Sequence, residues 1–157
     1  MTFVIEVQND AGYPVDAAAL VLAAETVLQA HEIEPDSVMT IVLSDDEAVA
    51  ALNRQFRGID SATDVLSFPM GGSPVPGEPP YLGDLVIAYP YSAAQAAREE
   101  FSPAHGLLLL VVHGTLHLLG YDHDSPESRT EMWAAQEAAL NVLGVPLSIA
   151  PRLEEDH

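Results

Sequence analysis

The sequence predicts an α+β fold in which a small sheet of about four strands packs against helices. Segments with strand-like patterns fall within the first 90 residues, and helical patterns dominate the remainder of the chain. In addition, the apolar run at residues 107–112 continues directly into a histidine-bearing segment whose apolar residues are not confined to one stripe. Such a helix is expected to be buried at the centre of the fold.

Length and composition predict one globular domain. With 157 residues, 48% of them apolar, the chain can bury a core of its own. We expect a single domain over residues 1–146 and an acidic C-terminal tail over residues 147–157. No run approaches the roughly 20 apolar residues of a membrane span, so no membrane association is expected. The start of the chain lacks a signal-peptide pattern, and the absence of Cys is compatible with a cytosolic protein.

Four segments read as strands. Residues 2–8 alternate between apolar and polar positions, which is typical of a strand with one buried face. Residues 38–43 form a short, nearly continuous apolar run that predicts a buried strand. A third strand is expected over residues 63–68, ending at Pro69, and a fourth over residues 82–88.

Five segments read as helices. They cover residues 16–31, 44–57, 92–100, 102–119 and 125–143. Asp16 is the expected N-cap of the first helix, and Ser44 begins a capping box with Glu47 at the second. Ser-Pro pairs start the last two helices, as expected for an N-cap followed by proline. Glycines that favour helix ends follow at Gly58, Gly120 and Gly144.

Three of the six histidines lie within eleven residues, at positions 113, 117 and 123. His113 and His117 are four residues apart, so they share one face of the predicted helix. Gly120 then allows a chain reversal that would bring His123 round to face them. Two imidazoles from a helix and a third from the next turn predict a zinc site. Its fourth position is left open for water, which is the pattern of a catalytic zinc.

A purely structural zinc site is the alternative, and it requires a fourth protein ligand. Because the chain has no Cys, only Asp or Glu can supply that ligand, and Asp122 and Asp124 are nearest. The remaining histidines have simpler explanations. His31 ends a helix, where a positive charge is favourable, and is interpreted as structural. His105 lies two turns before the histidine pair and His157 lies in the tail, so neither is expected to bind the metal.

Charged residues near this motif have two interpretations each. Arg54 and Arg57 end the second helix, where they either stay solvated or supply one anion clamp to the metal cleft. Three aspartates also have two interpretations. Each either accepts a hydrogen bond from the second ring nitrogen of an imidazole and so orients it, or is solvated at a turn or strand end: Asp64, Asp84 and Asp122.

The overall charge constrains the partners of this chain. There are 24 acidic residues against five arginines and no lysine, a net charge of −19. Such a surface repels nucleic acid at long range. Any nucleic-acid activity must therefore rest on a local cationic site made by the metal and a few arginines. An adaptation of the surface to solubility or salt explains the charge equally well.

The segment His-Gly-Thr-Leu-His-Leu-Leu-Gly-Tyr-Asp-His at 113–123 resembles the signature of the YbeY family of bacterial metal-dependent endoribonucleases. Two further blocks support the resemblance. Residues 52–57 followed by 63–69 resemble the second conserved block of the family, and Leu-Gly-Asp at 82–84 before an apolar strand resembles the third. The order and spacing agree over about residues 40–145.

The resemblance implies a zincin-like fold with a mixed four-stranded sheet and one zinc ion held by His113, His117 and His123. It implies catalytic roles for Arg57 and His113. It also implies cleavage of single-stranded RNA in ribosomal RNA maturation and ribosome quality control, in the cytoplasm and in contact with the ribosome or a ribosomal protein. The chain departs from the family at residues 58–62, which contain no lysine and no proline where the family usually has basic residues and a proline.

The chemistry of the motif favours phosphodiester cleavage over peptide cleavage. In the zinc peptidase helix motif, a Glu follows the first His and acts as the general base, whereas here that position is Gly114. A metal ion with Arg57 can stabilise the charge on the phosphate oxygens. Either water or the RNA 2′-hydroxyl can be the attacking group. A hydrolase of peptides or another small substrate, and a ribosome-associated factor with a structural metal, remain as alternatives.

Overall fold

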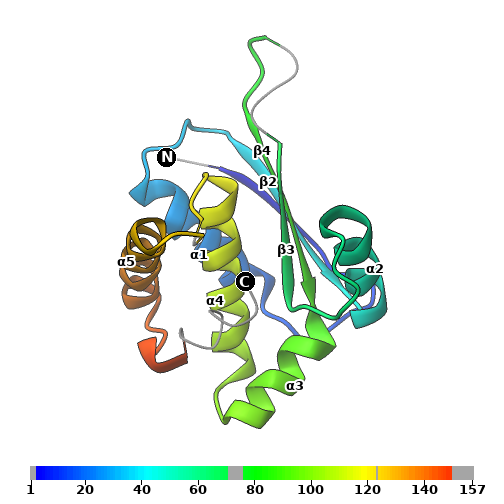
Figure 1. Ribbon diagram of the computed structural model, residues 1–157. Helices are drawn as coiled ribbons and strands as arrows, with labels where there is room; N and C mark the ends of the chain where they lie inside the picture. The colour runs from blue at the N-terminus through cyan, green and yellow to red at the C-terminus, as the bar shows by residue number, and fades with distance from the viewer. Residues whose placement is uncertain (1–2, 71–75, 123, 150–157) are drawn as a thin grey trace.

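The computed structural model describes residues 3–70, 76–122 and 124–149. These residues form four strands and five helices, as the sequence predicts (Figure 1). The strands are β1 (Val4–Gln8), β2 (Val38–Ser44), β3 (Val65–Pro69) and β4 (Tyr81–Ala88). The helices are α1 (Ala17–Ala30), α2 (Asp46–Arg57), α3 (Tyr89–Glu99), α4 (Pro103–Leu118) and α5 (Pro126–Leu143).

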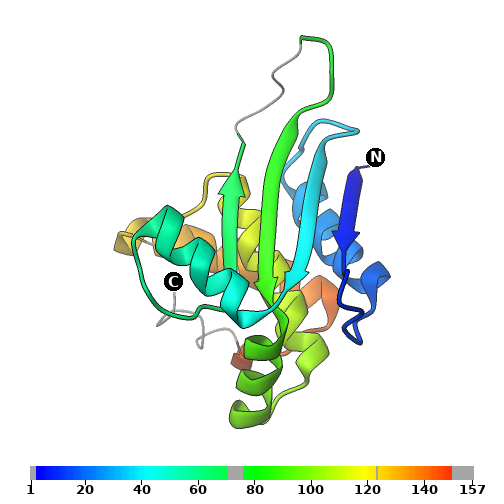
Figure 2. The ribbon, with the colours of Figure 1, turned by 90° about the vertical axis from the view of Figure 1, so that its right-hand side faces the viewer.

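The four strands form one mixed sheet in the order β1-β2-β4-β3. The first three of these run parallel to one another, whereas β3 runs antiparallel to β4 and lies at the edge (Figure 2). The prediction of an α+β fold with a mixed four-stranded sheet and about five helices is therefore confirmed.

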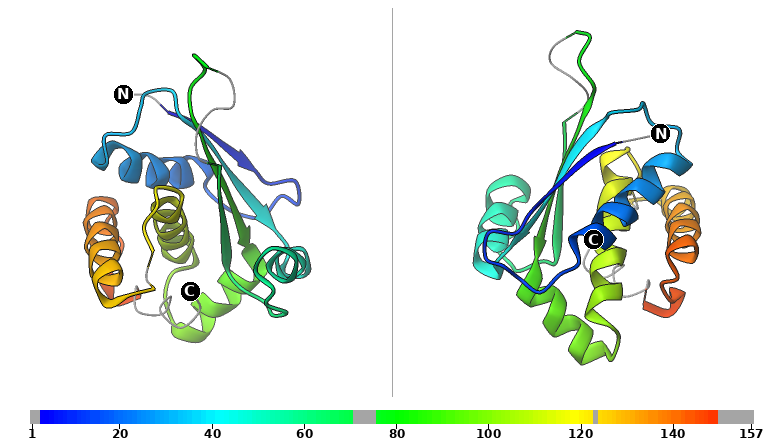
Figure 3. Two further views of the ribbon diagram at one scale, coloured as in Figure 1. Left: turned by 45° about the horizontal axis from the view of Figure 1, so that its top comes forward. Right: turned by 180° about the vertical axis from the view of Figure 1, so that it is seen from behind.

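Helices cover both faces of this sheet. On one side lie α1 and α4, with α5 packed against these two helices away from the sheet, and on the other side lies α2 (Figure 2, Figure 3). Helix α4 is central, since it contacts α1, α3 and α5 as well as β3 and β4. It is buried along most of its length, which explains why its apolar residues are not confined to one stripe. The main hydrophobic core lies around this helix.

The helix ends follow the predicted signals with two corrections. Helix α2 is capped by Asp45, whose side chain accepts a hydrogen bond from the Ala48 backbone N–H at 2.7 Å, and not by Ser44. Ser44 is unavailable because it is still paired in β2, opposite Ala88. Helix α3 begins at Tyr89, earlier than predicted, because the proline in its first turn favours a helix start directly after β4.

The end of the described chain packs against the core. Residues 147–149, which the sequence assigned to the tail, form a short 3₁₀ turn, and Ile149 is buried there. Residues 150–157, which include His157, lie outside the described residues. No helix in the described ranges is long and apolar enough to cross a membrane.

Candidate metal centre

His113 and His117 lie one turn apart on the C-terminal half of α4 and face each other. Their Nε2 atoms are 3.1 Å apart, and their ring planes are nearly perpendicular, at 85°. His113 is 0% exposed. His123, the third predicted ligand, lies outside the described residues, so the three-histidine set stays a prediction. Among the described residues, no three His, Asp or Glu side chains form a group that could hold a metal ion.

Each imidazole of this pair is oriented by a hydrogen bond at its other ring nitrogen. Nδ1 of His117 lies 2.9 Å from the backbone carbonyl oxygen of Tyr121. Nδ1 of His113 lies 3.0 Å from Oε1 of Gln136, on α5. A carbonyl oxygen can only accept a hydrogen bond, so each Nδ1 carries the proton and donates it. The two Nε2 atoms are therefore left with lone pairs that point toward each other.

This donor arrangement fits a metal ion. Two neutral lone pairs 3.1 Å apart repel each other, and a cation bound by both removes that repulsion. Zinc binds neutral imidazole nitrogen, and a ligating His almost always donates its second N–H to a carbonyl, carboxylate or water. The tautomer and the orientation of His113 and His117 therefore both fit the zinc ion that the resemblance implies.

A cleft of about 420 Å³ lies between β3, the end of α4 and the turn that follows it. Its lining residues are Arg57, Val65, Leu66, Ser67, Pro69, His113, His117, Gly120, Tyr121 and Asp122. The histidine pair thus borders a space large enough for part of a substrate. Strand β3 forms the neighbouring wall and is tied to α4 by the Ser67 hydroxyl, which donates to the Gly114 carbonyl at 3.4 Å.

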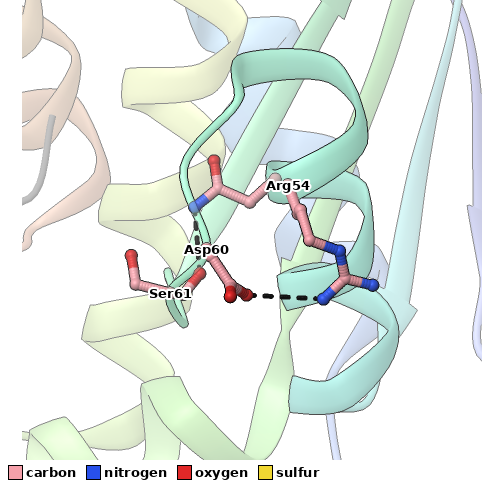
Figure 4. Close-up of polar contacts among 4 residues, drawn as sticks. Arg54, Asp60 and Ser61 are labelled. Atoms are coloured by element: carbon pink, nitrogen blue, oxygen red, sulfur yellow. Dashed lines mark hydrogen bonds and ion pairs between the residues drawn. The ribbon is translucent and has the colours of Figure 1, made fainter.

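The structure distinguishes between the two arginines of α2. Arg57, the last residue of the helix, lines the cleft, and no other arginine in the described part of the chain does so. Arg54 instead forms an ion pair with Asp60 at 3.4 Å, with side-chain exposures of 61% and 80% (Figure 4). Such an exposed pair contributes little to stability, so Arg54 serves chiefly as a solvated charge at the helix end.

The segment after Arg57 is held against α2 by Asn53. The Asn53 side-chain amide donates to the Ser61 carbonyl at 3.0 Å, and the Asn53 backbone carbonyl accepts from the Ile59 N–H at 3.4 Å. Gly58, which directly follows Arg57, adopts a left-handed conformation with φ of 70°, and this conformation favours glycine at a helix end. These contacts determine where the helix ends and so place Arg57 at the cleft.

The two described Nδ1 partners are not among the three aspartates that the sequence offered as possible orienting groups. The described partners of the imidazole Nδ1 atoms are Gln136 and the Tyr121 carbonyl, not carboxylates. Asp84 instead accepts a hydrogen bond from the Tyr81 hydroxyl, which also contacts the Thr40 hydroxyl at 2.9 Å. Asp64 is fully buried before β3, and Asp122 lines the cleft.

Gln136 was missed as a site residue when the sequence was read alone. It lies 23 residues beyond His113, and no sequence motif connects the two. The only signal was its position, four residues after Met132 and four before Leu140, on the buried face of α5. A polar residue within such an apolar stripe requires a hydrogen-bonding partner inside the protein.

Comparison with known proteins identifies the family. A family model described as Endoribonuclease YbeY matches residues 6–144 of the chain. The chain belongs to this family. Its members are endoribonucleases and therefore hydrolases, and the family is metal-dependent, in agreement with the paired imidazoles. The resemblance predicted from the histidine motif is thus confirmed.

Individual relatives agree over most of their length. An Endoribonuclease YbeY from Chloroflexus aggregans is 43% identical over 152 residues, covering 93% of this chain and 99% of the relative. One from Mycolicibacterium smegmatis is 41% identical over 144 residues, covering 87% and 80%. The solution structure of TM1509 from Thermotoga maritima matches with a TM-score of 0.58 and 26% identity, covering 90% of this chain and 89% of that one.

Proposed function

We propose that this protein is a zinc-dependent endoribonuclease that cuts single-stranded RNA during ribosomal RNA maturation and ribosome quality control in the cytoplasm. The observation that carries the proposal is the convergence of the His113 and His117 Nε2 lone pairs on a cleft that Arg57 also lines. His113, His117 and His123 are the proposed ligands of one zinc ion per chain.

The residues of the chain bind and orient the substrate. When bound, zinc supplies a Lewis acid that polarises a phosphoryl oxygen and lowers the pKa of water. The planar guanidinium of Arg57 can donate paired hydrogen bonds to phosphate oxygens. Negative charge increases on those oxygens in the transition state of phosphodiester cleavage. Arg57 therefore stabilises the transition state more than the ground state. On this basis we propose a catalytic role for Arg57. We propose one for His113 because it is a proposed metal ligand that also lines the cleft.

The position after His113 argues against a peptidase. A Cβ atom at Gly114 would lie 2.7 Å from Leu85 Cδ2 and 3.3 Å from Ser67 Oγ. Leu85 is fully buried, so a side chain at position 114 would crowd the packing of α4 against the sheet. The Glu that acts as general base in the zinc peptidase helix motif would therefore fit poorly at this position.

The acidic surface calls for a partner. With a net charge of −19 and one arginine in the described cleft, long-range attraction of RNA is absent. We propose that the ribosome, or a ribosomal protein with a basic surface, brings RNA to the cleft. Opposite charge on the partner would then speed its association with this protein.

Cleavage of a labelled single-stranded RNA by the zinc-loaded protein tests the proposal. We expect cleavage to stop when a chelator is added and to be lost in His117→Ala. Arg57→Ala should lower kcat/KM by 10²-fold or more, on the order of the loss of one transition-state donor. Arg54→Ala is the matched control, because it removes a guanidinium from the same helix without touching the cleft.

Cleavage that continues in the presence of chelator, or in His117→Ala, would overturn the proposed mechanism. Equal losses in Arg54→Ala and Arg57→Ala would remove the specific role of Arg57. Duplex RNA of the same sequence should be cut much more slowly, and equal rates on both substrates would contradict the single-strand preference.

A further inference from the structure

A series of three hydrogen bonds joins the end of α1 to the histidine pair on α4. Nδ1 of His31 lies 2.8 Å from the Val27 carbonyl oxygen. Nε2 of His31 lies 2.9 Å from the Tyr121 hydroxyl. The backbone carbonyl of Tyr121 in turn lies 2.9 Å from Nδ1 of His117. His31, which the sequence analysis interpreted as a structural residue at the end of a helix, thus contacts the turn beside the metal centre.

The direction of each bond follows from its chemistry. The Val27 carbonyl can only accept, so His31 carries its proton on Nδ1 and presents a lone pair at Nε2. The Tyr121 hydroxyl must then donate to that lone pair. The two rings also meet edge to face, with centroids 5.3 Å apart at an angle of 82°. His31 therefore holds the Tyr121 side chain through both a hydrogen bond and ring packing.

Tyr121 has two attachments that bear on His117. Its N–H donates to the Leu116 carbonyl at 3.1 Å, which ties the start of the turn to α4. Before it, Gly120 has φ of 100°, a conformation that side chains rarely adopt, so the chain turns sharply at that residue. The side-chain contact with His31 adds a second anchor on a different helix. Two anchors restrict the rotation of the Tyr121 peptide group and hence the direction in which its carbonyl points.

We propose that His31 and Tyr121 are positioning residues for His117, acting through the Tyr121 carbonyl to orient the imidazole for metal binding. The inference rests on the proposed role of His117 as a ligand. The proposal assigns neither residue to the metal itself, although Tyr121 also lines the cleft. A ligand imidazole held in one tautomer and orientation binds its metal more tightly, because less freedom is lost on binding.

Zinc affinity, measured by competition with a chromophoric chelator, tests this inference without reference to catalysis. Tyr121→Phe and His31→Phe both keep an aromatic ring and remove the hydrogen bond. We expect each to weaken zinc binding about 10-fold, at the low end of the effect of outer hydrogen-bond partners. The double variant should lose no more than one single variant, because both changes break the same bond. His31→Gln, whose amide oxygen can accept from Tyr121, should retain more affinity than His31→Phe.

The visible spectrum of the cobalt(II)-substituted protein and the urea unfolding of the metal-free protein separate positioning from simple stability. We expect an altered cobalt spectrum in Tyr121→Phe. Tyr13→Phe is the matched control, since its ring stacks on Tyr89 at 4.6 Å, and it should leave affinity and spectrum unchanged. Unchanged affinity and spectrum in Tyr121→Phe and His31→Phe, with only weaker unfolding stability, would overturn the inference.

The two levels of the proposal can fail separately. If the unaltered protein binds zinc and His117→Ala abolishes binding, the metal centre stands whatever the His31 variants do. If the unaltered protein binds no zinc, both the metal centre and the positioning role are wrong.

Discussion

Gln136 of α5 accepts a hydrogen bond from Nδ1 of His113 of α4 at 3.0 Å, inside a core where the two residues are 1% and 0% exposed. The bond joins two packed helices at the position of the predicted zinc ligand. It keeps the His113 proton on Nδ1 and directs Nε2 toward His117.

Removal of this acceptor should affect both stability and metal binding. Gln136→Leu leaves the buried Nδ1–H of His113 without its partner, which we expect to cost about 1–3 kcal/mol in the free energy of unfolding. Zinc affinity should fall about 10–100-fold, as for other outer hydrogen-bond partners of metal ligands. Urea unfolding of the metal-free protein and chelator competition measure the two effects. Glu137→Gln, an exposed neighbour on the same helix, is the control.

The close approach of α4 to the sheet gives a second prediction. Gly114→Ala places a methyl group 2.7 Å from the buried Leu85, and we expect a loss of about 1–3 kcal/mol from overpacking. Gly106→Ala on the same helix meets the Phe101 ring at 2.9 Å. That ring is only partly buried and can move, so the control should cost less. Equal effects in urea unfolding would mean that the approach at Gly114 is not tight.

The salt dependence of RNA binding should be unusually weak. Each phosphate contact on single-stranded nucleic acid contributes about −0.7 to the slope of log K against log salt concentration. With contacts only to Arg57 and the metal, we expect a slope of about −1.4, reduced by about half in Arg57→Ala. Fluorescence anisotropy of a labelled RNA over a range of salt concentrations measures this. A much steeper slope would reveal a cationic surface beyond the described cleft.

The contact between Tyr81 and Asp84 on β4 should make stability respond to high pH. Burial, followed by the hydrogen bond to Asp84, raises the pKa of Tyr81 above its ordinary value of 10.0. A group with a raised pKa in the folded state contributes stability that is complete below its unfolded pKa and is lost as the pH rises through the folded value. We therefore expect the free energy of unfolding to fall above pH 10, and to fall less in Tyr81→Phe. Urea unfolding at a series of pH values measures this. An equal decrease in the free energy of unfolding in both proteins would contradict the prediction.

Much of this protein was determined by its sequence because the relevant physics is local. The four-residue spacing places His113 and His117 on one face of any helix, whatever surrounds it. Ser102, Ser125, Gly58 and Gly144 cap helices through bonds to residues only a few positions away. The alternating exposure along β1 and the burial of α4 could also be predicted from the amino-acid pattern, because buried positions are mostly occupied by apolar residues.

Which distant residues meet depends on how the helices and strands pack together. Arg57 reaches the cleft and Arg54 does not, because the sheet edge and the end of α4 lie beside the last residue of α2. Gln136 orients His113, and His31 contacts Tyr121 across 90 positions of sequence. Asp84, predicted as a possible imidazole partner, bonds to Tyr81 instead. Such pairs form because packing brings buried polar groups together and each must find a partner there, a requirement that sequence spacing does not encode.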